Sequence, residues 1–333
     1  MLLKQYLTPE LKEQLQNTSC ECGFTLEDII RSGEENPDGA IGVYAGDKNC
    51  YHTFSPLFDP IIEDYHQYKL DEKHSKNLDY EQLGELPLLD PKRKYIISTR
   101  IRVGRNIKGY ALPPAIATFA RAFVESEILT ALNQLDNEHA GQYYPLSDLS
   151  DKDRDQLIED HFLFKKGDRF LESAGVNRNW PNNRGIFHSE NKRFLVWVNE
   201  EDQLRIISMQ EGGDILKVFK RLVQGIQKLE KNLTFQFDEH LGYISSCPTN
   251  LGTSLRASVH IKLPQLEKSN GLKEACEKLQ LSLRGTHGEH SKAESGVWDI
   301  SNKRRLGLTE VDCITTLYNG LKELIRLEKG LEQ

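Results

Sequence analysis

Residues 194–209 read Phe-Leu-Val-Trp-Val-Asn-Glu-Glu-Asp-Gln-Leu-Arg-Ile-Ile-Ser-Met. Residues 194–198 and 204–207 are short runs rich in β-forming residues, which predicts two strands. The acidic segment 199–202 lies between them. A cleft formed there would hold Glu201 close to Arg205, although acidic runs of this kind are often solvated turns.

The same pattern continues on both sides of this stretch. Residues 95–97, 233–237 and 259–263 are further strand candidates, and Phe235 and Phe237 alternate with polar neighbours. Asp214 can cap a helix whose apolar residues fall on one face, and a last helix is expected to begin near Thr309. Strands with helices packed to one side predict an α+β fold, with an antiparallel sheet covered by helices.

The first 70 residues have a different character. Thr8-Pro9-Glu10 supplies a helix cap, a proline at the first helical position and an early acid. We therefore expect a helical N-terminal domain over residues 1–72. Residues 73–94 are polar and proline-bearing, which predicts a linker, and residues 95–333 form the larger domain.

Composition limits the function classes. The chain has 333 residues, 38% hydrophobic and 28% charged, with a net charge of −7. An acidic balance argues against a general nucleic-acid or membrane-surface binder. No apolar run approaches the ~20 residues of a membrane span, and no secretory signal is visible.

The cysteines bear on the redox compartment of the protein and on possible metal sites. Six scattered cysteines do not form a disulfide framework, so a reducing cytoplasm is expected. Cys20 and Cys22 are close, but no second cysteine pair completes a four-cysteine zinc site. His287 and His290 have metal-like spacing without further ligands nearby, which favours a loop role.

Arginine placement is the strongest chemical signal. Ser98-Thr-Arg-Ile-Arg102 ends a predicted strand with two arginines at period two, so both side chains share one face. Arg205 stands in one strand candidate, Arg256 lies just before another, and Arg284 opens Arg284-Gly-Thr-His-Gly-Glu289. Arginine forks suit phosphate oxygens, although any single arginine could equally be a surface residue. Neither of the two common glycine-rich phosphate loops is present.

Several segments, taken together, resemble the phosphagen (guanidino) kinases. The matching motifs, in chain order, are Ser55-Pro-Leu-Phe-Asp-Pro-Ile-Ile-Glu-Asp-Tyr65, Ser98-Thr-Arg-Ile-Arg102, Val198-Asn-Glu-Glu-Asp202 with Leu204-Arg-Ile-Ile-Ser-Met209, Cys247-Pro-Thr-Asn-Leu-Gly-Thr253, Arg284-Gly-Thr286 and Asp299-Ile-Ser-Asn-Lys-Arg304. The resemblance covers nearly the whole chain. It implies a small helical N-terminal domain, a larger domain with an antiparallel sheet, and reversible transfer of the ATP γ-phosphoryl group to a guanidino nitrogen.

The resemblance also implies residue roles. ATP or ADP would be bound by Ser98, Thr99, Arg100, Ile101, Arg102, His161, Arg205, Arg256, Ala257, Ser258, Val259, His260, Arg284, Gly285, Thr286, His287, Gly288, Glu289 and Asp299. The catalytic residues would be Glu201, Glu289, Cys247 and Arg205. Mg²⁺ would be held through phosphates and waters, with Glu200 reaching those waters and no direct protein ligand. Cys247 is expected to be a thiolate of lowered pKa, assisted by Ser246.

The acceptor follows from the N-terminal domain. The guanidino substrate would contact Gly39, Ala40, Ile41, Gly42, Val43, Tyr44, Glu201, Cys247 and Glu289. A short loop ending in Gly-x-Tyr, together with Tyr65 and Glu289, resembles the pattern for L-arginine. Asp38 would pair with Arg169 when the domains close.

Three alternatives to an arginine kinase stay open. Taurocyamine or another guanidino compound could be the acceptor, because Gly39, Ala40, Ile41 and His287 depart from the common pattern. Residues 1–70 argue against a protein-arginine kinase. The intact set of arginines argues against an inactive nucleotide-binding relative. The chain could be a monomer or a homodimer.

Overall fold

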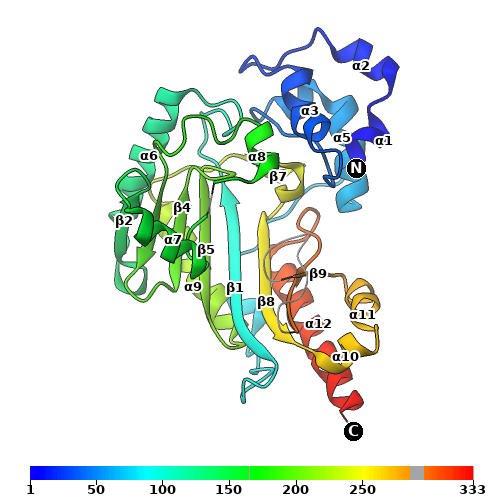
Figure 1. Ribbon diagram of the computed structural model, residues 1–333, viewed down its shortest axis with the longest axis vertical. Helices are drawn as coiled ribbons and strands as arrows, with labels where there is room; N and C mark the ends of the chain where they lie inside the picture. Colours follow the sequence, from blue (N-terminus) through cyan, green and yellow to red (C-terminus); the bar gives the residue numbers. More distant parts are fainter. Residues whose placement is uncertain (165, 286–295, 333) are drawn as a thin grey trace.

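The computed structural model describes residues 1–164, 166–285 and 296–332, and it has the expected α+β architecture (Figure 1). Helices form the N-terminal part: α1 (Leu2–Tyr6), α2 (Pro9–Leu15), α3 (Leu26–Glu35), α4 (Cys50–Thr53) and α5 (Ser55–His66). Thr8 caps α2 through its side chain, with Pro9 in the first turn, as the sequence predicts.

The larger domain is built on one antiparallel sheet of eight strands. Their order across the sheet is β2 (Gly141–Pro145), β3 (Gly185–Ser189), β4 (Phe194–Val198), β5 (Leu204–Glu211), β1 (Ile96–Arg105), β8 (Leu255–Lys262), β10 (Val297–Asn302) and β9 (Leu281–Gly285). A separate two-stranded ribbon joins β6 (Phe237–Asp238) to β7 (Gly242–Tyr243). The carboxyl end of β1 points towards the N-terminal helices (Figure 1).

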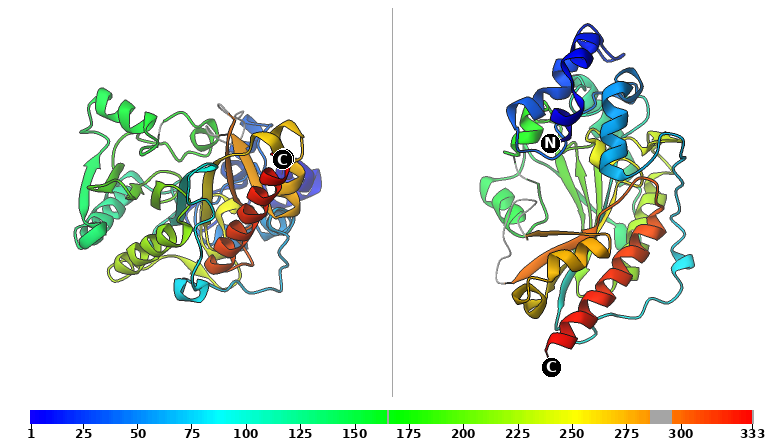
Figure 2. Two further views of the ribbon diagram at one scale, coloured as in Figure 1. Left: turned by 90° about the horizontal axis from the view of Figure 1, so that it is seen from below. Right: turned by 90° about the vertical axis from the view of Figure 1, so that its right-hand side faces the viewer.

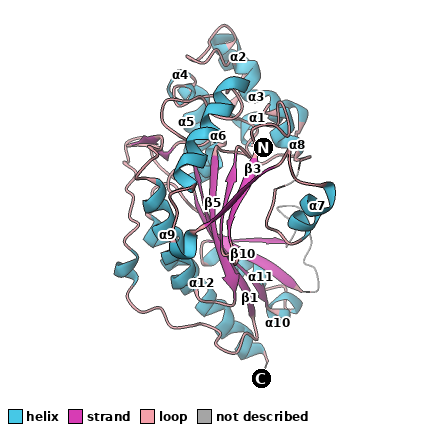
Figure 3. Cartoon of the chain, turned by 90° about the vertical axis from the view of Figure 1, so that its left-hand side faces the viewer, coloured by secondary structure: helices cyan, strands magenta, loops and turns pink. Residues whose placement is uncertain are grey.

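Helices cover one face of this sheet. The views from below and from the side place α6 (Thr118–Leu132), α9 (Ile215–Leu229) and α12 (Glu310–Leu331) on that face (Figures 2 and 3). Asp214 caps α9 and Thr309 caps α12, so both predicted helix starts are confirmed. The shorter elements are η1 (Tyr80–Leu83), η2 (Asn137–His139), α7 (Asp151–Glu159), α8 (Arg169–Ser173), η3 (Pro248–Asn250), α10 (Pro264–Lys268) and α11 (Leu272–Lys278). None of the helices in the described residues is both long and apolar enough to cross a membrane.

The apolar cores do not follow the predicted domain boundaries. One core fills the space between the sheet and its covering helices. A second core combines the N-terminal helices with Leu241, Ile244, Cys247, Leu251 and Leu306 of the larger domain. The predicted linker also contacts the larger domain, because the Tyr318 hydroxyl donates to the Pro87 carbonyl at 2.8 Å.

Two strand predictions need correction. β1 continues to Arg105, so residues 98–102 lie in the middle of the strand and not at its end. Residues 233–237 do not form one strand: Phe235 makes an isolated antiparallel bridge to Ile107, in the segment that follows β1, and Phe237 begins β6. The Gln236 N–H donates to the Asn106 carbonyl, and the Lys108 N–H donates to the Thr234 carbonyl. Burial does not alternate here, because Gln236 is buried as well as Phe235.

Candidate active site

The face of the sheet opposite α9 and α12 carries the arginines, and α7 packs over part of it beside Trp197 and Ile207 (Figure 3). Strand register pairs Arg102 with Arg256 and Gly104 with Arg205. Cross-strand partners point to the same face, and residues two apart on one strand do so as well. Arg100, Arg102, Arg205 and Arg256 therefore share one surface, as the sequence predicts for Arg100 and Arg102.

A second row of predicted site residues crosses four neighbouring strands on the same face. Ser98 pairs with His260, His260 with Asp299, and Asp299 with Arg284. The Arg256 Nη2 and Asp299 Oδ1 atoms lie 3.1 Å apart. Burial lowers the pKa of His260; Asp299 opposes this shift, while His161 and Arg100 add to it. His161 is thus close to the row although it lies in the loop after α7.

Four of the predicted nucleotide-binding residues turn the other way. Thr99, Ile101, Ala257 and Val259 are buried, and their side chains point to the helix-covered face of the sheet. The period of a strand requires this, since they alternate with the arginines and serines of β1 and β8. Ser258 and Gly285 lie on β8 and β9, whereas Thr286, His287, Gly288 and Glu289 lie outside the described residues.

The arginine face strongly favours an anionic occupant. Burial lowers the pKa of Arg100 to about 10, with Arg205 and Arg256 adding to the shift, and burial with the same kind of repulsion lowers the pKa of Arg102 well below its usual range. The Nε atoms of Arg100 and Arg305 are buried and have no hydrogen-bond partner among the described residues. The oxygens of a polyphosphate would accept hydrogen bonds from these unused donors and would neutralise the crowded guanidinium groups.

Arg305 is a site residue that the sequence reasoning missed. It lines a small pocket together with Arg102, Arg205 and Arg256. Its Nη1 donates to the Thr249 carbonyl at 3.0 Å and to Asn250 Oδ1, so it also ties down the segment after Cys247. The signal was present in the sequence, because Arg305 directly follows the motif that ends at Arg304.

The acidic segment between β4 and β5 holds Arg205. Arg205 donates to Glu200 at 2.9 Å and to Glu201 at 2.5 Å, which confirms the expected contact with Glu201. Burial alone would lower the pKa of Arg205, but Glu200, Glu201 and Asp202 together raise it. The guanidinium also lies 5.5 Å from the ring centre of Trp197, the neighbouring residue on β4. Arg205 is therefore fixed on three sides.

Asp202 is a second residue that the sequence did not single out. Its buried carboxylate accepts hydrogen bonds from Ser245 Oγ at 2.6 Å, from the Ser246 N–H at 2.9 Å and from Asn106 Nδ2 at 2.8 Å. These bonds join the acidic segment to the residues before Cys247. Asp202 thereby sets the position of Cys247 relative to Glu201.

Cys247 lies where the resemblance implies, but its expected pKa is wrong. Its side chain is buried, and burial and the nearby Glu201 charge raise the pKa of the thiol to about 12. The hydrogen-bond partner is Thr249, with Sγ and Oγ1 3.1 Å apart, and not Ser246. Ser246 instead donates to the Glu201 carbonyl at 3.2 Å. A thiol next to a carboxylate stays protonated unless a cation joins them.

The loop that ends in Gly-x-Tyr reaches the same place. Gly42 has φ +85° and packs against Met1 and Leu3, which leaves no room for a side chain. Tyr44 is buried, and burial with the charges of Cys247 and Glu201 raises its pKa well above the usual range. The Ala45 N–H donates to the Ser246 carbonyl at 2.8 Å. The loop is therefore anchored beside Glu201 and Cys247.

A contact between the two domains also matches the sequence. Arg169, the first residue of α8, forms an ion pair with Asp38 at the start of the loop. Both side chains are more than half exposed. Phe170 packs against Gly39, so α8 and the loop meet through an apolar contact as well.

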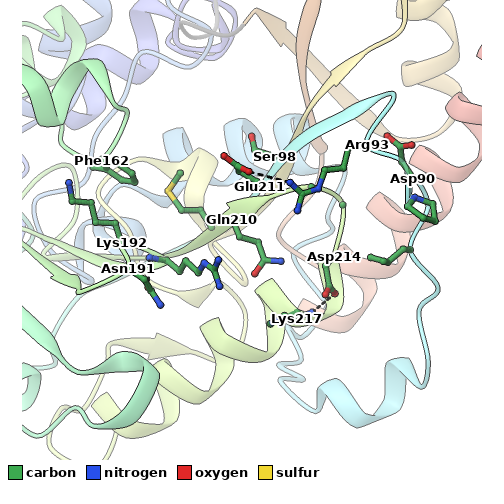
Figure 4. Close-up of a pocket in the computed structure, with 16 residues that line it drawn as sticks. Asp90, Arg93, Ser98, Phe162, Asn191, Lys192, Gln210, Glu211, Asp214 and Lys217 are labelled. Carbon is green, nitrogen blue, oxygen red and sulfur yellow. Dashed lines mark hydrogen bonds and ion pairs between the residues drawn. The ribbon is translucent and has the colours of Figure 1, made fainter.

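The row of nucleotide-site residues opens into a larger pocket at its Ser98 end. This pocket has a volume of about 570 Å³, and Phe162 and Met209 contribute to its wall (Figure 4). Arg93 and Glu211 form an ion pair at its rim at 3.2 Å. Arg100 and Arg102 follow Ser98 along β1, so this strand leads from the pocket to the crowded arginines.

Known proteins resemble the chain over its full length. Residues 1–63 match the N-terminal domain of ATP:guanido phosphotransferases, and residues 123–331 match the C-terminal catalytic domain. An arginine kinase of Anthopleura japonica is 52% identical over 333 residues, which cover 99% of this chain and 46% of that protein. An arginine kinase of Penaeus vannamei is 49% identical over 332 residues, which cover 99% of this chain and 93% of that protein.

Solved structures agree with the sequence relatives. The duplicated taurocyamine kinase from Schistosoma mansoni superposes with a TM-score of 0.93 at 43% identity, covering 98% of this chain and 46% of that one. A lombricine kinase superposes with a TM-score of 0.91 at 38% identity, covering 99% and 92%. The chain thus spans about half the length of the Anthopleura and Schistosoma proteins and nearly all of the others.

Proposed function

Because the chain belongs to the ATP:guanido phosphotransferase family, we propose that it transfers the γ-phosphoryl group of ATP reversibly to the guanidino group of L-arginine. The products are phosphoarginine and ADP. One observation carries the proposal: the arginine face of the sheet ends at Glu201. Cys247 of the larger domain and Tyr44 of the acceptor loop, residues 39–44, both lie near Glu201. A phosphate-binding surface and a guanidinium-binding corner therefore meet.

The arginines stabilise charge on the phosphates. Phosphoryl transfer depends on positioning and on neutralising the three equatorial oxygens more than on covalent help. Arg100, Arg102, Arg256 and Arg284 line the face, and Arg305 adds a buried donor at its acceptor end. Arg205, held by two carboxylates, keeps its orientation without moving when the reaction begins.

The acidic and thiol groups act on the guanidinium. Glu201 can accept two guanidinium N–H bonds and align one nitrogen with the γ-phosphorus. A guanidinium beside Cys247 would lower the pKa of that thiol, since a nearby cation favours the thiolate. Glu289 would flank the other side of the substrate, as the resemblance implies. Whether Glu201 also removes a proton is a separate question from its role in alignment.

Mg²⁺ fits the oxygen groups at this site. The Glu200 side chain is 13% exposed at the arginine face, and its two oxygens lie 2.9 and 2.8 Å from Arg205 Nη1. Mg²⁺ prefers oxygen ligands and keeps several waters, so phosphate oxygens and waters within reach of Glu200 would hold it. The bound ion would neutralise charge on the phosphates. Glu200 meanwhile orients Arg205, because both of its oxygens contact Arg205 Nη1.

The loop of residues 39–44 indicates which guanidino compound accepts the phosphoryl group. Residues 39–44 are short and have no lysine or arginine, so their backbone N–H groups are the donors for an α-carboxylate. Taurocyamine is the second candidate, because the Schistosoma taurocyamine kinase is 43% identical with a TM-score of 0.93. Its sulfonate could use the same donors.

A coupled assay with L-arginine, taurocyamine, creatine and an arginine-bearing protein separates these substrates. We expect L-arginine to exceed creatine in kcat/KM by at least ~100-fold, because the creatine N-methyl group would leave a carboxylate without its partner. Glu289→Val should lose most arginine activity without gaining efficient use of creatine. Equal or better turnover of taurocyamine or creatine by the wild type would refute the choice of arginine. No turnover of any of the four would refute the proposed function.

A further inference from the structure

Four metal-ligand groups gather in the N-terminal domain, where Asp47 follows Tyr44 of the acceptor loop by three residues. The side chains are Cys20, Cys22, Asp47 and Cys50, and their ligand atoms all lie within 4.8 Å of one another. Cys20 Sγ lies 3.2 Å from Cys22 Sγ and 2.7 Å from Cys50 Sγ. We propose that these residues bind one zinc-type divalent metal ion through three thiolates and one carboxylate.

The first half of the site is a tight turn that presents two cysteines. The Cys20 N–H donates to the Phe24 carbonyl, and the Gly23 N–H donates back to the Cys20 carbonyl at 2.9 Å. Gly23 has φ +80°, a conformation that glycine adopts without strain. Ser19 and Thr25 close the turn through a β-bridge. Cys20 and Cys22 therefore point from one short loop to one place.

The second half comes from the start of α4. Asp47 accepts N–H bonds from Cys50 at 2.7 Å and from Cys22 at 3.0 Å, one on each carboxylate oxygen. A carboxylate offers about four lone-pair sites, so oxygen capacity remains for a metal. Asp47 thus joins both halves. A four-cysteine zinc site would need a second cysteine pair besides Cys20 and Cys22. Here an aspartate and a cysteine, Asp47-x-x-Cys50, take the place of that pair.

The donor set suits zinc. Zn²⁺ takes four ligands in a tetrahedron, with Zn–S near 2.3 Å, which places two sulfurs about 3.8 Å apart. The sulfurs here would spread by roughly 1 Å, which small side-chain rotations provide. Thiolates select zinc over Mg²⁺ or Ca²⁺. Binding would release thiol protons to solvent, and the exposed Cys22 gives the ion a way in.

A disulfide is the main competing explanation. It would use Cys20 and Cys50 and would leave the Cys22 thiol, 3.2 Å from Cys20 Sγ, outside the bond, whereas Asp47 is held by its two N–H bonds in either case. Zinc uses all four groups. It would also connect the turn before α3 to the residue after Gly46, so the ion would hold the end of the acceptor loop.

The test uses the full chain, reduced with a phosphine and supplied with Zn²⁺ or Co²⁺ at low micromolar concentration. We expect one ion per chain by native mass spectrometry, thiolate-to-Co²⁺ charge-transfer absorption with tetrahedral d–d bands, and a rise of about 3 °C or more in Tm with Zn²⁺. Cys276→Ser is the control, because Cys276 is a buried cysteine of α11 in the larger domain.

Cys22→Ser is the decisive variant. Cys22 is exposed, so its replacement leaves the core packing of the metal-free chain intact. We expect metal affinity to fall at least ~10-fold while Tm without metal is unchanged. Cys50→Ser should abolish binding. Failure of the reduced wild type to take up metal, uptake by Cys22→Ser equal to wild type, or a Cys20–Cys50 disulfide in place of metal uptake would each overturn the proposal. None of these readouts depends on kinase activity.

Discussion

Arg205→Ala should damage both turnover and stability, for reasons that can be separated. In turnover, loss of one charge-stabilising group at the phosphates costs about 3 kcal/mol, or ~100-fold or more in kcat. In folding, the side chain of Arg205 is 10% exposed and those of Glu200 and Glu201 are 13% and 16% exposed. Removing one partner of such a buried pair costs about 3–5 kcal/mol, because the remaining charges are uncompensated.

The two effects respond differently to a second change. Glu200→Gln in the Arg205→Ala background removes one of the unpaired charges, so part of the lost stability should return while kcat stays low. Urea unfolding measures the first quantity, and the coupled assay at saturating substrates measures the second. The matched control is Arg326→Ala, since Arg326 pairs with Glu323 at the surface of α12 and should change stability by less than about 1 kcal/mol. A folded Arg205→Ala enzyme with near-wild-type kcat would refute the role of Arg205.

Three further predictions concern the thiol, the domain contact and pH. Iodoacetamide labelling of Cys247 should keep accelerating from pH 7 to pH 10, because the pKa is about 12; a plateau by pH 8 would contradict this. Cys247→Ser should be impaired but active. Exchanging the charges of Asp38 and Arg169 should restore kcat/KM lost in either single variant, and purely additive losses would show that the pair is uncoupled. Burial lowers the pKa of both His66 and His74 from 6.5 to about 4, so each should contribute about 2 kcal/mol to a fall in unfolding free energy from pH 7 to pH 5, and His66→Gln should make that fall smaller by about 2 kcal/mol in urea titrations.

The sign of the pH effect follows from proton uptake. The unfolded chain protonates His66 below its ordinary pKa, whereas the folded chain keeps the ring neutral until about pH 4. Stability from this residue is therefore complete above pH 6.5 and declines as pH falls towards 4. The ring Nε2 lies 2.8 Å from the Pro248 carbonyl, a bond that glutamine can also donate.

Local sequence patterns predicted much of the fold because they report local physics. The alternation around Arg100 and Arg102 placed both on one face, and the caps at Asp214 and Thr309 marked helix starts. The strand expected at residues 233–237 is present only as a β-bridge at Phe235 and the first residue of β6, because alternation does not show the partner to which a segment bonds. Which strands neighbour one another depends on contacts between distant residues, so the row from Ser98 to Arg284 could not be derived from spacing.

The site was less predictable where burial changes chemistry. Charged neighbours around Cys247 suggested a thiolate, but the side chain lies beside Glu201 in a buried position, which favours the thiol. In the sequence, Asp202 looks like one more acidic residue of a surface turn. Its role emerges only when Ser245, Ser246 and Asn106 converge on it from two other segments.

The core shared by the N-terminal helices and the Cys247 region bears on whether the two domains of family members can be exchanged. The two family matches end at residue 63 and begin at residue 123, which invites the view of two interchangeable modules. Yet Leu251 and Leu306 of the larger domain pack in the same apolar cluster as the N-terminal helices. In a chimera joined in the linker, this shared core would combine side chains from two different proteins, which would not pack well against each other. New acceptor specificities in this architecture should therefore arise by altering the loop in place, with the interior left whole.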